Sequence, residues 1–220
     1  IGALAYFLQS WSLPAAILLL LFFNFLFEKG YLDPRNKAYG LEYPNNDLRP
    51  KYDPGSLNAI CSADILQKDK EQMISVLNKW KTRQVSAKPL MIFINVSGGG
   101  LRSSAFTMHA MQKLDSMLHG KLMKKTFLIS GASGGMLAAT YYRELYRRKI
   151  HGASIHLSSP QYLNNITGDL LNSVFSSMMA RDLMASSLKF SVGNNKYIKD
   201  RGYAFEKKLS ENTNDILNVQ

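Results

Sequence analysis

The chain has 220 residues, of which 46% are hydrophobic, so it can bury a sizeable core. Its single cysteine excludes an intramolecular disulfide framework and a cysteine-rich metal site. The formal net charge of +11 points either to an anionic partner, a phospholipid surface or nucleic acid, or to basic helix ends that solvent covers.

Residues 1–27 carry no charged side chain, and about 20 apolar residues are enough to cross the hydrocarbon core of a membrane. A signal peptide is the alternative, but Glu28-Lys29-Gly30 is not a small-residue cleavage site. We therefore expect a transmembrane helix over 1–27. Five basic residues follow closely and place the rest of the chain on the cytoplasmic side of the membrane: Lys29, Arg35, Lys37, Arg49 and Lys51.

Residues 28–61 contain four prolines among Asn, Asp and Gly, which predicts an irregular linker. The remaining residues, 62–220, are interpreted as the N-terminal part of one folded domain. Apolar residues at helical spacing, with Ser62 as a cap, predict a helix to about Arg83. Because the chain starts at Ile1 and stops within a polar stretch, we expect it to be a fragment of a longer protein.

The segment from Pro89 to Lys149 reads as strand, glycine turn, helix, strand, glycine turn, helix. Strands are predicted over 91–96 and 126–129, and helices over 103–119 and 136–149. This order implies a parallel crossover and an α/β layer architecture. Two further helical regions are expected, at 161–190 and at 200–212. The Met and Phe side chains of the first region either belong to the core or line an acyl-chain channel or lid.

The first turn contains Gly98, Gly99 and Gly100 directly before a helix. Such a run supplies backbone N–H groups that can bind an oxyanion or a phosphate, although a plain tight turn has the same composition. The spacing fits neither the Gly-x-Gly-x-x-Gly pattern nor a P-loop.

The second turn, Gly131-Ala132-Ser133-Gly134-Gly135, has the Gly-x-Ser-x-Gly pattern of a nucleophile elbow. Its glycines permit a tight reversal from strand to helix and leave the serine accessible. Ser133 also lies at a helix N-terminus, whose partial positive charge favours a nearby oxyanion. An oxyanion donor and a nucleophile are the two parts that acyl transfer requires.

Ser-Gly-Gly-Gly-Leu-Arg followed by Gly-Ala-Ser-Gly-Gly resembles the patatin-like phospholipase family and, more distantly, cytosolic phospholipase A2, over about residues 89–150. The resemblance implies a three-layer α/β fold with a parallel central sheet, and hydrolysis of lipid acyl esters by a Ser–Asp dyad without a metal or cofactor. By motif position it implies that Ser133 is the nucleophile and that Arg102 supports the oxyanion or a lipid phosphate. It further implies an oxyanion hole of Gly98, Gly99 and Gly100, and an elbow held by Gly131 and Gly135.

The sequence departs from the family at two places. Ser97 stands where many patatins have aspartate. The phospholipase A2 relatives also have serine at this position. The aspartate of the dyad normally precedes glycine, but none of the downstream aspartates does: Asp169, Asp182, Asp200 and Asp215. We therefore expect the general base to lie beyond Gln220 or to be absent.

The leading hypothesis is a membrane-anchored serine acyl hydrolase that acts on phospholipid or another lipid ester, with a membrane and not a nucleic acid as its partner. A Ser-His-Asp α/β-hydrolase is the second hypothesis, with four histidines as candidates: His109, His119, His151 and His156. The third is a catalytically inactive, lipid-binding membrane protein.

Overall fold

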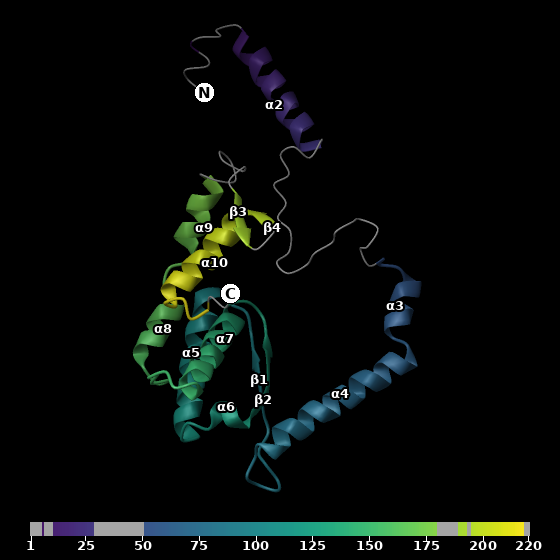
Figure 1. Ribbon diagram of the computed structural model, residues 1–220. Coiled ribbons are helices and arrows are strands. Elements are labelled where there is room, and N and C mark those ends of the chain that lie inside the picture. The colour runs from purple at the N-terminus through teal and green to yellow at the C-terminus, as the bar shows by residue number, and fades with distance from the viewer. Residues whose placement is uncertain (1–5, 7–10, 29–50, 180–188, 193–194, 218–220) are drawn as a thin grey trace. The chain divides into compact units, whose positions relative to one another are not determined.

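The computed structural model describes residues 6, 11–28, 51–179, 189–192 and 195–217. The chain divides into two compact units. One consists of Ile1–Gly40 and Leu170–Lys207, and the other of Leu41–Asp169 and Lys208–Gln220. Helices make up most of the described chain (Figure 1).

The second unit is built on one strand–helix–strand–helix segment. Strands β1 (Ile92–Val96) and β2 (Thr126–Gly131) pair in parallel, and α5 (Gly100–Met117) connects them together with the short α6 (Leu122–Lys125). Helix α7 (Ser133–Ile150) follows β2 directly. The predicted order of elements between Pro89 and Lys149 is therefore confirmed, although both long helices begin about three residues earlier than predicted.

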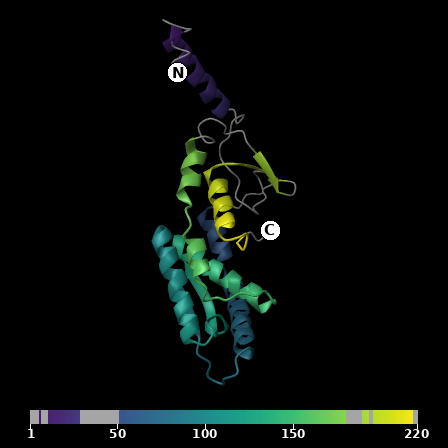
Figure 2. The ribbon, with the colours of Figure 1, turned by 90° about the vertical axis from the view of Figure 1, so that its left-hand side faces the viewer.

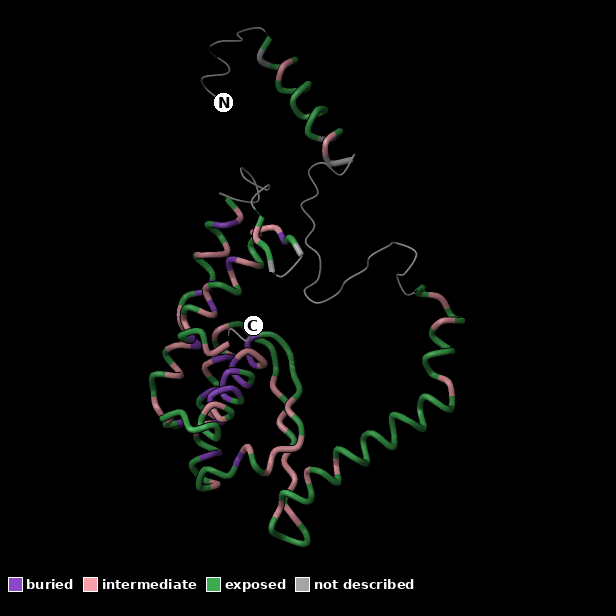
Figure 3. Tube along the Cα trace, viewed as in Figure 1, coloured by how far each residue is buried: buried purple, intermediate pink, exposed green. Residues whose placement is uncertain are grey.

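The core of this unit lies between α5 and α7, which pack side by side in both views of the ribbon (Figure 2). From α5, Met108 and Met111 are buried, and from α7 come Tyr141, Tyr142 and Leu145. The tube coloured by burial shows the buried residues gathered along these helices (Figure 3). The small residues Ala138 and Ala139 are fully buried as well, which allows the helices to approach closely.

Further helices belong to the same unit. The predicted helix after Ser62 is confirmed as α4 (Ala63–Thr82), and its Trp80 packs edge-on against Phe127 of β2 with ring centroids 6.2 Å apart. Within the segment expected to be irregular, α3 (Pro54–Ile60) forms behind an Asp53 cap, whose carboxylate accepts from the Ser56 N–H. Helix α8 (Pro160–Ile166) packs on α5.

The prediction of a three-layer fold around a parallel central sheet is wrong. The described chain is mostly helical, and its one parallel sheet has only two strands. A three-layer fold covers both faces of its sheet with helices. Here Phe93 and the opposite Leu128 share one face and are 60% and 49% exposed, so that face has no helical layer among the described residues.

The first unit contains helix α2 (Ser12–Glu28), helix α9 (Leu171–Ser177) and an antiparallel hairpin of β3 (Lys189–Val192) and β4 (Asn195–Ile198). Helix α10 (Arg201–Asn212) starts in this unit and ends in the other. It confirms the helix predicted over 200–212. Its start is capped by Asp200, which accepts a hydrogen bond from the Tyr203 N–H at 2.9 Å.

The predicted transmembrane helix is also wrong. In the described part of the chain, no helix combines the length and the apolar character that a membrane span needs. Helix α2 has 17 residues, so at a rise of 1.5 Å per residue it extends about 26 Å, against a hydrocarbon core of about 30 Å. Residues 1–5 and 7–10 of the predicted span lie outside the described residues. The membrane-anchored, cytoplasm-facing location that depended on this span is corrected with it.

Candidate active site

The register of the parallel sheet brings the two glycine turns together. Val96, the last residue of β1, pairs with Gly131, the last residue of β2. Both turns therefore leave the sheet at the same edge, the carboxyl ends of the strands, where α/β proteins commonly place their ligand sites. The Ala132 N–H donates to the Val96 carbonyl oxygen at 3.3 Å and ties the second turn to the end of β1.

Ser133 has the backbone conformation of an elbow nucleophile. Its φ is +52°, a left-handed value that a non-glycine residue rarely adopts, while Ala132 before it is extended at φ −141°. Ser133 is exposed and is the first residue of α7. A serine held in such a strained turn between a strand and a helix is the arrangement of the Gly-x-Ser-x-Gly motif.

Gly131 fits the elbow for a steric reason. Its φ of +154° is unfavourable for a side chain, and a Cβ there would lie 3.0 Å from the carbonyl carbon of Val96. The turn therefore requires glycine at this position.

The first turn lies against Ser133. A Cβ built on Gly98 would be 3.2 Å from the Ser133 Cβ and 3.8 Å from its Oγ, so the Gly98 backbone is a direct neighbour of the hydroxyl group. Gly99 and Gly100 have φ values of +148° and +58°. Within the described part of the chain, the N–H groups of Gly98, Gly99 and Gly100 donate no hydrogen bond to another backbone group outside the regular elements. They can therefore donate to an oxygen atom bound beside Ser133.

Gly134 and Gly135 let α7 approach the first turn at backbone distance. A Cβ on Gly134 would lie 2.8 Å from the Gly100 carbonyl carbon, and one on Gly135 would lie 3.0 Å from the Ser103 Oγ. Both glycines are buried. They position the nucleophile turn against the glycine run, as the motif predicts for Gly135.

Two residues at this site were missed by the sequence reasoning. Gly134 follows Ser133, and the N–H of the residue after the nucleophile is a usual oxyanion donor in elbow turns. Ser104 is 1% exposed, and its hydroxyl contacts the Gly134 carbonyl oxygen at 2.8 Å and that of Gly100 at 3.3 Å. The motif alone contained the signal for Gly134, whereas nothing in the sequence singled out Ser104.

Arg102 lies in the first turn of α5, two residues after Gly100, and is exposed. It makes no ion pair with a residue that the structure describes. Its position is therefore compatible with the predicted role beside an oxyanion or phosphate, without a contact to Ser133.

Among the described residues, no histidine or carboxylate forms a hydrogen bond with Ser133, so none is in position to act as its general base. All four candidate histidines are exposed, and His119 and His151 follow the far ends of α5 and α7. Asp115 is buried, but it is fifteen residues along α5 from Gly100, which corresponds to about 22 Å. Its carboxylate accepts from the Leu122 N–H at 3.0 Å and so anchors α6.

The downstream aspartates have structural roles where they are described. Asp200 caps α10, and the side chain of Asp215 accepts from the Ser210 hydroxyl at 2.9 Å. Asp169 precedes Leu170 and uses its backbone carbonyl to accept from Asn212. Asp182 lies outside the described residues. The structure thus brings together Ser133, the predicted nucleophile, and the glycines predicted to bind an oxyanion, and no base contacts Ser133 among the residues described.

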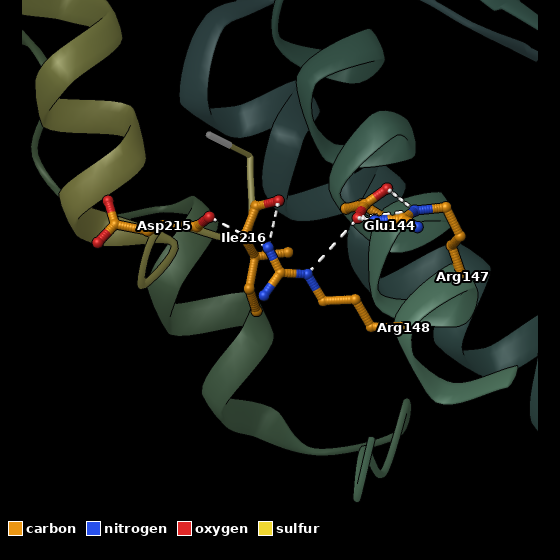
Figure 4. A network of polar contacts seen from close by, with 5 residues as sticks. All are labelled: Glu144, Arg147, Arg148, Asp215 and Ile216. Atoms are coloured by element: carbon orange, nitrogen blue, oxygen red, sulfur yellow. Dashed lines mark hydrogen bonds and ion pairs between the residues drawn. The ribbon is translucent and has the colours of Figure 1, made fainter. Parts of the chain in front are cut away.

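The basic end of α7 is partly neutralised within the fold. Arg147 donates to both carboxylate oxygens of Glu144, with Nε at 2.9 and 2.8 Å, and Arg148 Nε lies 3.5 Å from the same carboxylate (Figure 4). The hydrogen bonds from Arg147 hold the pKa of Glu144 below its ordinary value, against the opposing effect of burial. Arg148 also donates to the carbonyl oxygens of Asp215 and Ile216, at 3.2 and 3.3 Å. These two arginines are therefore engaged within the fold.

Comparison with known proteins gave no relative: no protein-family model, no curated protein and no solved structure matches this chain.

Proposed function

We propose that this protein is a serine acyl hydrolase whose nucleophile is Ser133. The observation that carries the proposal is the left-handed backbone of an exposed serine directly beside the glycine run. In the proposed reaction the Ser133 Oγ attacks the ester carbonyl carbon, and the backbone N–H groups of Gly98 to Gly100 stabilise the oxygen as it gains negative charge. The ester C–O bond then breaks, the alcohol leaves with the proton from the serine hydroxyl, and water hydrolyses the acyl-serine to release the acid and restore Ser133.

The proposed substrate class is lipid esters, including phospholipids. Support comes from the resemblance of the two ordered motifs to the patatin-like family and from the exposed Arg102 next to the glycine run. A guanidinium group there can pair with the phosphate of a phospholipid.

The test is labelling of the protein with a fluorophosphonate probe, which reacts with activated serines, followed by hydrolysis of a lipid ester. The wild type should be labelled and should release fatty acid, and Ser133→Ala should abolish both. Ser130→Ala is the matched control, because Ser130 is exposed three residues away and donates only to Asn95 at 3.3 Å. Labelling that survives in Ser133→Ala would refute the assignment.

A second candidate function is lipid binding without hydrolysis. It is favoured by one observation: within the described residues, no base contacts Ser133. An unactivated serine would not react with the fluorophosphonate, whereas the protein would still bind lipid esters. Absence of labelling in the wild type would therefore select this function over the first.

A further inference from the structure

A pocket of about 330 Å³ lies between β2, α6 and α7. Ligand pockets in proteins typically start at about 300 Å³, so its size suits a small molecule. Its wall is largely apolar, with Met123 from α6, Phe127 and Ile129 from β2 and Met136 from α7, and it also includes Thr140 and Arg143.

Helix α7 presents different faces to the core and to this pocket. Tyr141, Tyr142 and Leu145 are fully buried in the core. Met136, Thr140 and Arg143 follow one another at intervals of four and three residues, which places them on one stripe of the helix. None of these three side chains belongs to the buried core.

Arg143 differs from the other arginines of α7. Arg147 and Arg148 both interact with Glu144. Arg143 is exposed and forms no ion pair with any residue in the described part of the chain. One guanidinium group therefore lies at the edge of an apolar pocket with its charge uncompensated by the residues described, and Thr140 adds a hydroxyl group one turn away.

We propose that this pocket binds the anion of an aliphatic carboxylic acid, with the hydrocarbon chain against the apolar wall and the carboxylate on Arg143. A guanidinium group binds a carboxylate with two parallel charge-assisted hydrogen bonds, and burial of methylene groups against Phe127 and Met136 adds a hydrophobic contribution. Arg143 is ten residues beyond Ser133, about 15 Å along the helix axis, so the bound carboxylate would lie away from the proposed nucleophile, while Met136 at the other end of the stripe is three residues from it.

Octanoate binding to the whole chain, measured by calorimetry at neutral pH, tests the proposal without any enzymatic step. Octanoate should bind saturably, and Arg143→Gln should weaken its binding roughly tenfold or more, the usual effect of losing a charge-assisted hydrogen bond. Lys149→Gln removes the same charge from an exposed position on the same helix and should leave binding unchanged. No binding, or equal losses in the two variants, would overturn the proposal.

Methyl octanoate separates a free acid from an esterified acyl chain, because it has the same hydrocarbon without the charge. It should bind at least tenfold more weakly than octanoate, and equal binding would overturn the assignment of a carboxylate to Arg143.

Methyl-labelled methionine locates the ligand by NMR. Octanoate should shift the signals of Met123 and Met136 but not that of Met117, which is 67% exposed on α5. A shift confined to Met117 would place the ligand elsewhere and refute the site.

Discussion

The hydroxyl group of Ser104 donates a hydrogen bond of 2.8 Å to the carbonyl oxygen of Gly134, and so joins helix α5 to the turn that carries Ser133. Ser104 is 1% exposed, so water cannot replace its hydroxyl. Ser104→Ala should lower the free energy of unfolding by about 1 kcal/mol, the typical net value of one such bond. It should also slow fluorophosphonate labelling, because the turn is less firmly held.

Urea unfolding measures the stability effect of Ser104→Ala. Ser116→Ala is the control, since Ser116 is exposed on the same helix and should change stability by less than about 0.5 kcal/mol. Equal effects of the two substitutions would show that the bond between α5 and the Ser133 turn contributes nothing.

Gly134→Ala tests the close approach of the two turns. The new methyl group would lie 2.8 Å from the Gly100 carbonyl carbon and 2.9 Å from the Ser104 Oγ, so backbone must move to admit it. We expect a loss of about 1–3 kcal/mol in the free energy of unfolding, as for other overpacked sites. Gly55→Ala, also near the start of a helix, meets only the Asp53 carboxylate at 3.2 Å and should be neutral or slightly stabilising. Thermal unfolding of the two variants measures the difference in stability. A Gly134→Ala protein as stable as the wild type would contradict the close packing described for the two turns.

Glu144 should make stability depend on pH in acid. Its pKa in the folded protein is lowered by the hydrogen bonds from Arg147, so the folded state favours the charged form. The resulting stabilisation is fully present above the ordinary glutamate pKa of about 4.3 and is lost as the pH falls through the lower folded value. The wild type should therefore lose more stability than Glu144→Gln between pH 6 and pH 3, as measured by urea unfolding. Parallel pH profiles would exclude this role of Glu144.

The adjacent tyrosines of α7 should respond differently to loss of their hydroxyl groups. Both are fully buried. Tyr141 accepts a hydrogen bond from Asn165 at 3.1 Å, whereas the Tyr142 hydroxyl lies near the Asp115 carboxylate without a hydrogen bond of standard geometry. Burial, and then the negative charge of Asp115, raises the pKa of Tyr142. Tyr141→Phe should cost about 1 kcal/mol, and Tyr142→Phe should cost less, because the Tyr142 hydroxyl has no well-formed hydrogen bond to lose. Chemical unfolding of both variants compares them directly, and a larger loss for Tyr142→Phe would contradict the assignment.

Local sequence patterns predicted the elements around the site well. The short apolar runs before the two glycine turns predicted strands, and the glycines indicated where the turns fall, although no residue of either strand is fully buried. The steric demands at Gly131 and Gly135 are consistent with the motif. In contrast, Ser104 could not be singled out, because its role depends on how closely α5 and α7 pack, and no spacing in the sequence encodes that distance.

The larger architecture was predicted less well, because hydrophobic composition does not determine how far an element extends. The apolar run of residues 1–27 suggested a span, but helix α2, Ser12–Glu28, is too short for one, and no other helix among the described residues qualifies. Two consecutive parallel strands suggested a covered sheet, but Phe93 and Leu128 are exposed on one face. The net charge of +11 suggested an anionic partner, but a net charge does not show that Arg147 and Arg148 both interact with Glu144 on the same helix.

The left-handed backbone of Ser133 also restricts which nucleophile this turn can carry. A β-branched side chain at a φ of +52° clashes with its own backbone, so threonine, which has the same hydroxyl group, is disfavoured there. Cysteine has no branch at Cβ and meets no such restriction. The backbone of this one residue therefore disfavours threonine and admits nucleophiles without a branch at Cβ, such as serine, cysteine and aspartate, before any question of reactivity arises.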